Sequence, residues 1–411
     1  MKNWFKKRIY LDHASYTPID KAVLKVVHRV GKERLHTNIA NDLSYHKEGR
    51  RSKDIVETSR ETVAKILQVR PSEIIFTQNA TESDNLALQG RVKALRDGGR
   101  EYSDMHIIIG LMDHPAIIKT AEMLENKGVK LTKVLPDGRG VISPESVVEQ
   151  IREDTVMVSV CYVSSELGIV QPIKQIAEAI NKTRGGITFH TDAAQAGSYL
   201  SCEPHLLGVS MLTLDGIKIY GPSGVGVLYK DASVKISPMF YGGGQEMGLK
   251  SGTQNIELIA GFAEAMRISK ERRKRDFENV GRIRDEMLRL LREVVPDVFL
   301  YGRDGIDTTG IAPHYAFINI PNVDSEYLAA SLDVRGFSVG TKSACSEFSV
   351  ELEAIYGNGR GNGNGGGNGN GGGKVQKDGL RVTLGRGTTR SNIRGFVAAV
   401  SEIIKERNCL K

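Results

Sequence analysis

The chain has 411 residues, of which 40% are hydrophobic and 26% are charged, as in ordinary globular proteins large enough for two domains. Its net charge of +7 is modest for this length, and no segment approaches the roughly 18 consecutive apolar residues of a membrane span. The first residues lack the apolar core of a signal peptide, so we expect a cytoplasmic protein without a membrane partner.

The cysteines indicate neither a disulfide framework nor a metal site. Cys161, Cys202, Cys345 and Cys409 are the four cysteines, and none belongs to a CxxC pair. Four unpaired cysteines in a chain of this length argue against zinc, so we expect no metal. The sequence leaves open the alternative that one of the four is a reactive thiol and the other three are structural. Cys161 lies in an apolar run, where we expect core packing.

A helix start follows the first strong apolar run. The residues EIIF (73–76) precede TQNATESDNLAL (77–88), in which Thr81 stands before acidic residues and an apolar series. This pattern predicts a helix N-terminus. Free backbone N–H groups there would suit a phosphate, although an ordinary N-cap is the simpler interpretation.

Short β-branched runs then alternate with helical patterns. Such alternation predicts a mainly parallel sheet covered on both faces, with ligands at the carboxyl ends of its strands. His114, Ser165, Asp192 and Lys218 each follow a strand-like run, which favours a common site. The expected strands are 106–113, 156–163, 187–192 and 225–229, with a helix at 172–184 between two of them.

The pattern changes near residue 260. A basic segment (267–295) carries Ile283, Met287, Leu290, Leu291 and Val294 at helical spacing. We interpret it as a solvated amphipathic helix; a docking face for an acidic partner is the alternative. The segment has no nucleic-acid-binding motif, so we expect no direct nucleic-acid partner. Expected strands near 315–320 and 380–384 and a helix from 391 complete this part.

We therefore predict two domains. Residues 20–260 would form a large α/β domain, and residues 1–19 with 261–411 a smaller α+β domain. The Gly/Asn-rich tract at 357–373 resists regular structure. As a flexible coil it would span roughly 23 Å. It does not resemble a phosphate-gripping loop, because no strand precedes it and no Lys-Ser/Thr follows.

Asp192, Gln195 and Lys218 together indicate pyridoxal phosphate (PLP) chemistry. A lysine amine can hold the aldehyde of PLP as a Schiff base, while a carboxylate keeps the ring nitrogen protonated. A lone Lys–Asp pair is more often an unconnected strand-end acid and surface lysine. The other motifs of the chain overturn that simpler interpretation.

Those motifs resemble a known family. Together they are similar to a cysteine desulfurase of the PLP-dependent, class V aminotransferase-like superfamily, in its branch with a long cysteine loop. The resemblance covers nearly the whole chain except the Gly/Asn-rich tract, and it implies the PLP-dependent transferase fold (fold type I) with a mainly parallel seven-stranded sheet. The motifs are IYLDHASYTPID (9–20), ATESDNLA (80–87), the DHP around His114, SSELGIVQPI (164–173), HTDAAQAG (190–197), IKIYGPSGVG (217–226), GGGQEMGLKSGT (242–253), SACS (343–346) and LRVTLGR (380–386).

The resemblance implies roles for the residues around the cofactor. Lys218 would form the Schiff base and then move the substrate Cα proton. Asp192 would pair with the ring nitrogen, Gln195 would bond the phenolic oxygen, and His114 would stack on the ring and transfer protons. Further cofactor contacts would come from Ala80, Thr81, Ser165 and, from the other subunit of a homodimer, Thr253.

The substrate would be L-cysteine, with its carboxylate held by Arg381 in a charge-assisted fork. Cys345 would attack the substrate sulfur as a thiolate, leaving L-alanine and a protein persulfide. The persulfide would then pass to a sulfur-acceptor protein, either an iron–sulfur scaffold or a tRNA-thiolation protein, which the sequence does not name.

Several positions depart from the family pattern. Asp215 and Ile217 replace a Ser and a His that contact the phosphate, Ser165 replaces an Asn, and Lys342 replaces a Gly. A carboxylate repels a phosphate, and losing two charged hydrogen bonds would cost about 3–6 kcal/mol. Lys250 or backbone N–H groups are candidates for compensation. The helical segment after the cysteine is also partly replaced by the Gly/Asn-rich tract.

Three hypotheses remain. An active cysteine desulfurase is the leading one. A related PLP-dependent lyase or transaminase, such as a selenocysteine lyase, is the second, although the cysteine in SACS argues against it. The third is a degenerate dimer that no longer holds PLP well and serves as a sulfur-relay or binding scaffold, which Asp215 and Ile217 favour.

Overall fold

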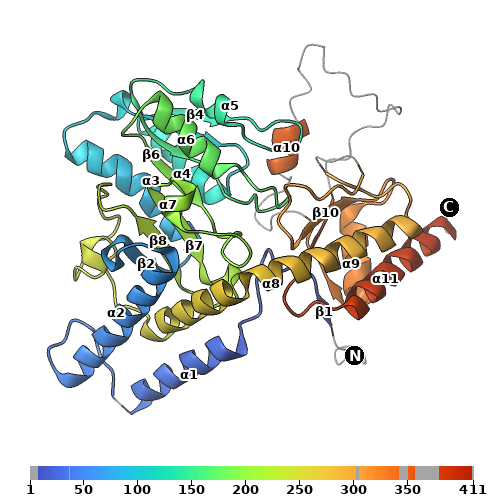
Figure 1. Ribbon diagram of the computed structural model, residues 1–411, viewed down its shortest axis with the longest axis horizontal. Helices are drawn as coiled ribbons and strands as arrows, with labels where there is room; N and C mark the ends of the chain where they lie inside the picture. The colour runs from blue at the N-terminus through green and yellow to red at the C-terminus, as the bar shows by residue number, and fades with distance from the viewer. Residues whose placement is uncertain (1–7, 37, 302–304, 342–349, 357–378, 410–411) are drawn as a thin grey trace.

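A seven-stranded sheet forms the centre of the larger part of the protein (Figure 1). The computed structural model describes residues 8–36, 38–301, 305–341, 350–356 and 379–409. The strand order is β2-β8-β7-β6-β5-β3-β4, and β8 alone runs antiparallel to its neighbours. The mainly parallel seven-stranded sheet is thus confirmed. Its strands are β2 (Ile74–Thr77), β3 (His106–Gly110), β4 (Lys130–Val134), β5 (Thr155–Ser159), β6 (Thr188–Asp192), β7 (Met211–Asp215) and β8 (Gly226–Lys230).

The central strands are buried on both faces, which explains their near-continuous apolar character. In β3, Ile107 and Ile109 belong to one hydrophobic cluster and Ile108 to the other. Side chains alternate between the faces of a strand, so the two clusters lie on opposite sides of the sheet. The sheet therefore positions its functional side chains at strand ends rather than on its faces.

Helices supply the two layers that cover the sheet. Apolar residues of α3 and α4 pack in the cluster that contains Ile107, whereas those of α2, α6 and α8 pack in the cluster that contains Ile108. The predicted helix at 172–184 is α6. The helices of this part are α1 (Lys21–Leu35), α2 (Lys47–Leu67), α3 (Ala80–Asp97), α4 (Pro115–Asn126), α5 (Pro144–Val148), α6 (Ile173–Thr183) and α7 (Pro204–Leu207).

A smaller part packs at one end of the long helix α8 (Ile256–Val294) (Figure 1). Its antiparallel sheet has the order β12-β10-β9, and β1 pairs in parallel with β11. The division at residue 260 stays a prediction, and it falls inside α8, which is continuous there. The elements are β1 (Ile9–Tyr10), β9 (Phe299–Leu300), β10 (Tyr315–Asn319), α9 (Ser325–Val334), β11 (Phe337–Ser338), α10 (Val350–Tyr356), β12 (Leu380–Thr383) and α11 (Arg390–Cys409).

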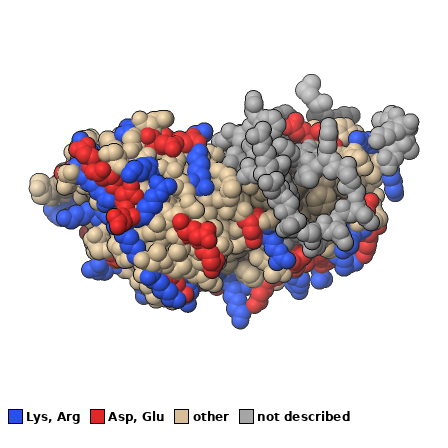
Figure 2. Space-filling view, turned by 90° about the horizontal axis from the view of Figure 1, so that it is seen from above, with Lys and Arg blue, Asp and Glu red and all other residues tan. Residues whose placement is uncertain are grey.

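The predicted basic amphipathic helix is the second half of α8. Met287 and Leu291 are buried along it, while Val294 is exposed at the helix end. Its exposed Arg267 pairs with Glu264 and Glu271 one turn away. Figure 2 likewise shows basic and acidic side chains interspersed on the face it presents. These pairs support the solvated-helix interpretation.

Within the described ranges, none of the helices combines the length and apolar character needed to cross a bilayer.

Candidate active site

Most of the residues predicted for the site line a single cavity of about 340 Å³. All but Arg381, which lies in β12 of the smaller sheet, follow the carboxyl ends of the parallel strands or lie at the start of α3, as the fold predicts. Thr253 does not line this cavity, and Cys345 and Lys342 lie outside the described residues. The predicted residues in the lining are Ala80, Thr81, His114, Ser165, Asp192, Gln195, Lys218 and Arg381.

Lys218 lies in a short 3₁₀ turn, η3 (Gly216–Lys218), directly after β7. Its Nζ donates hydrogen bonds to the carbonyl oxygens of Ala14 (2.6 Å) and Ser15 (2.7 Å). Burial lowers the pKa of this amine, and the nearby Arg381 lowers it further. A lowered pKa increases the fraction of neutral amine, which is the form that attacks an aldehyde.

Asp192 ends β6 and is buried, with Oδ1 accepting a hydrogen bond from the N–H of Ala194 (2.9 Å). Burial raises the pKa of this carboxyl, while His114 and Lys218 act in the opposite direction. Gln195 follows on the same loop and donates from Nε2 to the carbonyl oxygen of Ala14 (3.0 Å). The acid and the amide therefore lie beside the lysine, as predicted.

His114 is the N-cap of α4. Its Nδ1 accepts a hydrogen bond from the N–H of Ala116 (3.1 Å), so the proton of the neutral ring is assigned to Nε2. Burial lowers the pKa of the imidazole, which favours the neutral form. A neutral ring in the cavity can stack on an aromatic ligand and exchange a proton through Nε2.

Arg381, in β12, brings the smaller part of the protein to the cavity. Nη1 donates to the carbonyl oxygen of Ser165 (3.0 Å), and Nη2 donates to Asp12 Oδ1 (3.1 Å) and Ser15 Oγ (2.6 Å). Nε is buried and has no partner among the described residues. Gly340 leaves room beside it, since a Cβ there would lie 3.2 Å from Nε. Three of the five N–H donors of this guanidinium are thus paired, and Nε lacks a partner in the part of the chain that the structure describes.

The N-terminal segment was not assigned to the site from sequence. Ala14 and Ser15 line the cavity and contact Lys218 and Arg381. The available signal was the resemblance of residues 9–20 to the start of the family, which carried no role for individual residues.

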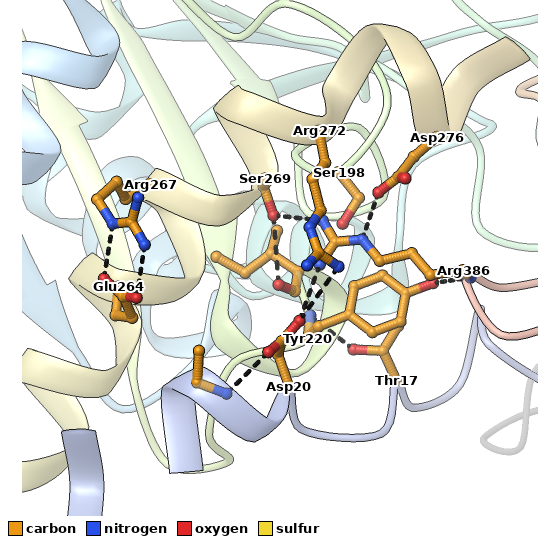
Figure 3. Close-up of polar contacts among 12 residues, drawn as sticks. Thr17, Asp20, Ser198, Tyr220, Glu264, Arg267, Ser269, Arg272, Asp276 and Arg386 are labelled. Carbon is orange, nitrogen blue, oxygen red and sulfur yellow. Dashed lines mark hydrogen bonds and ion pairs between the residues drawn. The ribbon is translucent and has the colours of Figure 1, made fainter. Parts of the chain in front are cut away.

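The loop after Lys218 is held by a polar network that joins three parts of the chain (Figure 3). Thr17 Oγ1 donates to the carbonyl oxygen of Ile217 (2.6 Å) and accepts from the N–H of Tyr220 (2.8 Å). Ser198 Oγ donates to the carbonyl oxygen of Lys218 (3.2 Å). The backbone on both sides of the lysine is therefore tied to neighbouring elements.

Arg386 closes this network from the loop after β12. Its guanidinium lies 4.1 Å from the centroid of the Tyr220 ring, and its Nε donates to Asp276 Oδ2 (2.5 Å) on α8 (Figure 3). The backbone N–H of Arg386 also donates to the Tyr220 hydroxyl (2.9 Å). Tyr220 has φ of 61°, a left-handed conformation that is uncommon outside glycine. The contacts of Arg386 help to hold this conformation two residues from the lysine.

The start of α3 differs from the prediction in its cap. Asn79 is the N-cap, and its side chain accepts from the N–H of Glu82 (2.9 Å), while Thr81 is exposed in the first turn. The N–H of Ala80 donates to Asp215 Oδ2 (2.9 Å). The sequence pattern located the helix start but not the cap, because Asn79 and Thr81 both have side-chain oxygens suited to it.

Thr253 is exposed and lines a neighbouring cavity of about 440 Å³ together with Lys250. Asp215 and Ile217 line both cavities and therefore form part of the wall between them. Of the cysteines, Cys161 is buried, as expected, and its Sγ donates to the carbonyl oxygen of Met112 (3.3 Å).

The residues fit PLP at the ring end of the cavity. A buried amine of lowered pKa, a buried carboxyl and a neutral imidazole face one space, and Arg381 lines the same cavity. The start of α3 is different, because a carboxylate already accepts its first N–H group.

Comparison with known proteins agrees with this geometry. The family described as aminotransferase class-V matches residues 9–396. A cysteine desulfurase IscS of Dictyoglomus turgidum is 30% identical over 98% of this chain and 95% of its own length. A putative cysteine desulfurase IscS 1 of Bacillus subtilis is 33% identical over 97% of this chain and 99% of its own length.

Solved structures give the same result. A NifS-like protein superposes with a TM-score of 0.85 at 28% identity, covering 97% of this chain and 99% of its own. A structure of SspA in complex with cysteine superposes with a TM-score of 0.74 at 28% identity, covering 92% of this chain and 99% of its own. These matches confirm the expected fold type I, and the chain belongs to the class-V aminotransferase family.

Proposed function

We propose that the chain is a PLP-dependent cysteine desulfurase, which converts L-cysteine to L-alanine and leaves the sulfur as a persulfide on Cys345. The observation that carries this proposal is the convergence of Lys218, Asp192, His114 and Arg381 on one cavity. The IscS relatives, matched over nearly the whole chain, support the reaction, and the cysteine-bound SspA structure supports the substrate class.

The side chains bind and orient the substrate. PLP, when bound, supplies an electron sink that stabilises negative charge at the substrate Cα. Asp192 would pair with the ring nitrogen, and Gln195 would bond the phenolic oxygen. Arg381 binds the substrate carboxylate, with Ser165, Asp12 and Ser15 accepting from three of its five N–H donors and its Nε lacking a partner among the described residues. Fixing the carboxylate orients the substrate for proton removal at Cα.

Two groups move protons. Lys218, with its lowered pKa, accepts the Cα proton as a neutral amine. His114 is neutral because of burial and exchanges a proton through Nε2. The Cys345 thiolate attacks the substrate sulfur; the C–S bond breaks, an S–S bond forms, and the alanine carbon takes up a proton. The reaction needs no external oxidant, because the electron pair of the broken C–S bond stays on Cβ, which is reduced to the alanine methyl group as the two sulfurs are oxidised to the persulfide level.

Two partners belong to this proposal. A second copy of the chain would bring its Thr253 to the phosphate end of the cavity. The Thr253 of the same chain instead lines a neighbouring cavity. A sulfur-acceptor protein, either an iron–sulfur scaffold or a tRNA-thiolation protein, would receive the persulfide sulfur.

The test uses the full chain with excess PLP and L-cysteine. Alanine is measured by amino-acid analysis and the persulfide by mass spectrometry of the Cys345 peptide. Cys345→Ala should abolish both products, whereas Cys202→Ala, which removes a buried thiol away from the cavity, should retain both. Full alanine formation by Cys345→Ala would refute the persulfide mechanism.

Asp215 favours a second candidate, a scaffold that does not retain PLP. Its carboxylate accepts the N–H of Ala80 at the start of α3, where a phosphate would otherwise be bound. This candidate predicts no alanine from the wild-type protein even at saturating PLP, an outcome that the same assay detects.

A further inference from the structure

Asp215 joins the end of β7 to the start of α3. Its Oδ2 accepts a hydrogen bond from the N–H of Ala80 (2.9 Å), and its Oδ1 accepts one from the N–H of Ile217 (3.1 Å). The residue is 5% exposed and lines the cavity beside Lys218. A buried carboxylate therefore uses backbone donors on two sides of the cavity wall.

These donors are the ones that an anionic ligand would use. The N-terminus of a helix attracts anions through its free N–H groups and its dipole. In α3 the N–H of Ala80 is taken by Asp215, and the N–H of Glu82 is taken by the Asn79 side chain. A phosphate group brought to this helix would meet a carboxylate already bonded there.

Few surrounding groups offset a second anion in this cavity. Lys218 attracts Asp215, whereas burial favours the neutral form of His114, and Asp84 and Asp192 are two further buried carboxyls. Lys250 lines the neighbouring cavity that Asp215 also borders, and it is absent from the lining of the cavity beside Lys218. Ile217, which follows in η3, offers the cavity only an apolar side chain. Burial raises the pKa of Asp215, as expected where negative charge is disfavoured.

We propose that Asp215 is an internal anion at the phosphate end of the cavity, so that the site binds the pyridoxal ring with little contribution from the phosphate. Asp215 is then the residue that sets selectivity between PLP and pyridoxal, which is the same aldehyde without its phosphate. This inference rests on the proposed function only in taking a pyridoxal compound as the ligand.

The experiment compares the two aldehydes on the full-length protein. Kd is measured for PLP and for pyridoxal by equilibrium dialysis, with no activity readout. In the wild type PLP should bind less than about tenfold more tightly than pyridoxal, which is less than one charge-assisted hydrogen bond provides. Asp215→Ser and the isosteric Asp215→Asn should each tighten PLP binding by about 10- to 100-fold and change pyridoxal binding by less than about threefold.

The comparison separates two effects of Asp215. Its charge also raises the pKa of Lys218, and a change acting through the lysine would alter both aldehydes equally. Asp231→Asn is the matched control, since Asp231 Oδ1 likewise accepts a backbone N–H, from Ser233 (2.8 Å), and does not line the cavity. It should leave both Kd values unchanged.

Several results would overturn the proposal. One is an equal change of Kd for PLP and for pyridoxal in the Asp215 variants. Another is a gain in PLP affinity below about threefold in Asp215→Asn, and a third is no binding of either aldehyde by the wild type. If the variants fail to fold, the wild type decides alone, because a PLP preference of tenfold or more contradicts the proposal. Alanine assays are independent: a protein with the expected Kd pattern and no alanine formation would refute the desulfurase function and leave this inference standing.

Discussion

The two sides of Lys218 are held in different ways. After the lysine, Tyr220 contacts Thr17 of the N-terminal segment and Arg386 of the loop after β12, and Arg386 in turn bonds Asp276 on α8. Before the lysine, Thr17 bonds the carbonyl oxygen of Ile217, and the Asp215 carboxylate ties the chain to the start of α3. Thr17, Tyr220 and Arg386 do not line the cavity, whereas the Asp215 carboxylate accepts from a donor that a phosphate could take.

This difference separates two requirements of the site. Placing an amine of lowered pKa next to Asp192 depends on the backbone network after the lysine and on burial. Binding an anion depends on the residue before it. A chain can therefore keep the residues for chemistry at the lysine while the phosphate end of the cavity changes.

The largest effect is expected from Lys218→Ala. Loss of the amine should lower kcat for alanine formation by at least about 1,000-fold, because the covalent and proton-transfer roles are both removed. The matched control is Lys230→Ala, whose Nζ also donates to two backbone carbonyls, those of Asp231 and Val234. It should keep near-normal activity, and equal losses in both variants would show that the effect is structural.

Arg386→Ala should destabilise the folded protein. The change takes from the buried Asp276 the guanidinium that bonds its Oδ2, removes one of the two hydrogen bonds of Ser269 and removes the cation over the Tyr220 ring, at a cost of about 3 kcal/mol. Arg267→Ala, an exposed arginine of α8 paired with Glu264 (Figure 3), should cost less than about 1 kcal/mol. Urea unfolding measures the loss of stability in both variants. Similar losses would contradict the role of Arg386 in holding the loop after Lys218.

Arg381→Gln should act on substrate binding. Losing the charged donor should lower kcat/KM for L-cysteine by about 10- to 100-fold, mainly through KM, since the carboxylate is bound before the chemistry. Arg284→Gln is the comparison, because Arg284 is also a buried arginine and donates to the carbonyl oxygen of Ala312 (3.0 Å) away from the cavity. An unchanged KM in Arg381→Gln would show that Arg381 does not bind the substrate carboxylate.

The smallest effect concerns Glu351, which holds α10 against the loop at one wall of the cavity. Its carboxyl accepts the N–H groups of Glu166 (2.8 Å) and Leu167 (2.9 Å), and burial, with the nearby Glu166, raises its pKa to about 8. A carboxyl whose pKa is higher in the folded than in the unfolded protein takes up a proton on folding. The free energy of unfolding should therefore fall as pH rises from 6 to 8, by about 1.4 kcal/mol per pH unit from this group.

Glu351→Gln should remove that part of the slope in urea unfolding at pH 6, 7 and 8. Asp113, whose pKa burial also raises to about 8, keeps a similar dependence in both proteins. A slope that is identical in wild type and variant would show that Glu351 does not titrate in this range.

The sequence predicted the framework well because local patterns determine it. The four expected strands, the helix at 172–184 and the strands near 315–320 and 380–384 are all present. The convergence of His114, Asp192 and Lys218 follows from a parallel sheet, since neighbouring strands end at the same edge. These features depend on hydrophobic periodicity and topology, which a single sequence carries.

Other features depend on contacts between distant segments. Nothing in the local pattern of Ala14 and Ser15 indicates that their carbonyl groups would accept from Lys218, 204 and 203 positions away. Asp215 was expected to repel a phosphate, but not to bond the first N–H of α3. Such pairings arise from tertiary packing, so residue type alone does not reveal them. The role of Cys345 stays a prediction, because it lies outside the described residues.

The most direct test of the central claim is to locate the bond between the protein and the cofactor. The full chain is incubated with excess PLP, reduced with borohydride and digested, and the labelled peptide is sequenced by mass spectrometry. We expect a phosphopyridoxyl group on Lys218 in the wild type, its loss in Lys218→Ala, and labelling of Lys230→Ala equal to that of the wild type. Labelling at other lysines alone, or none at saturating PLP, would contradict this expectation.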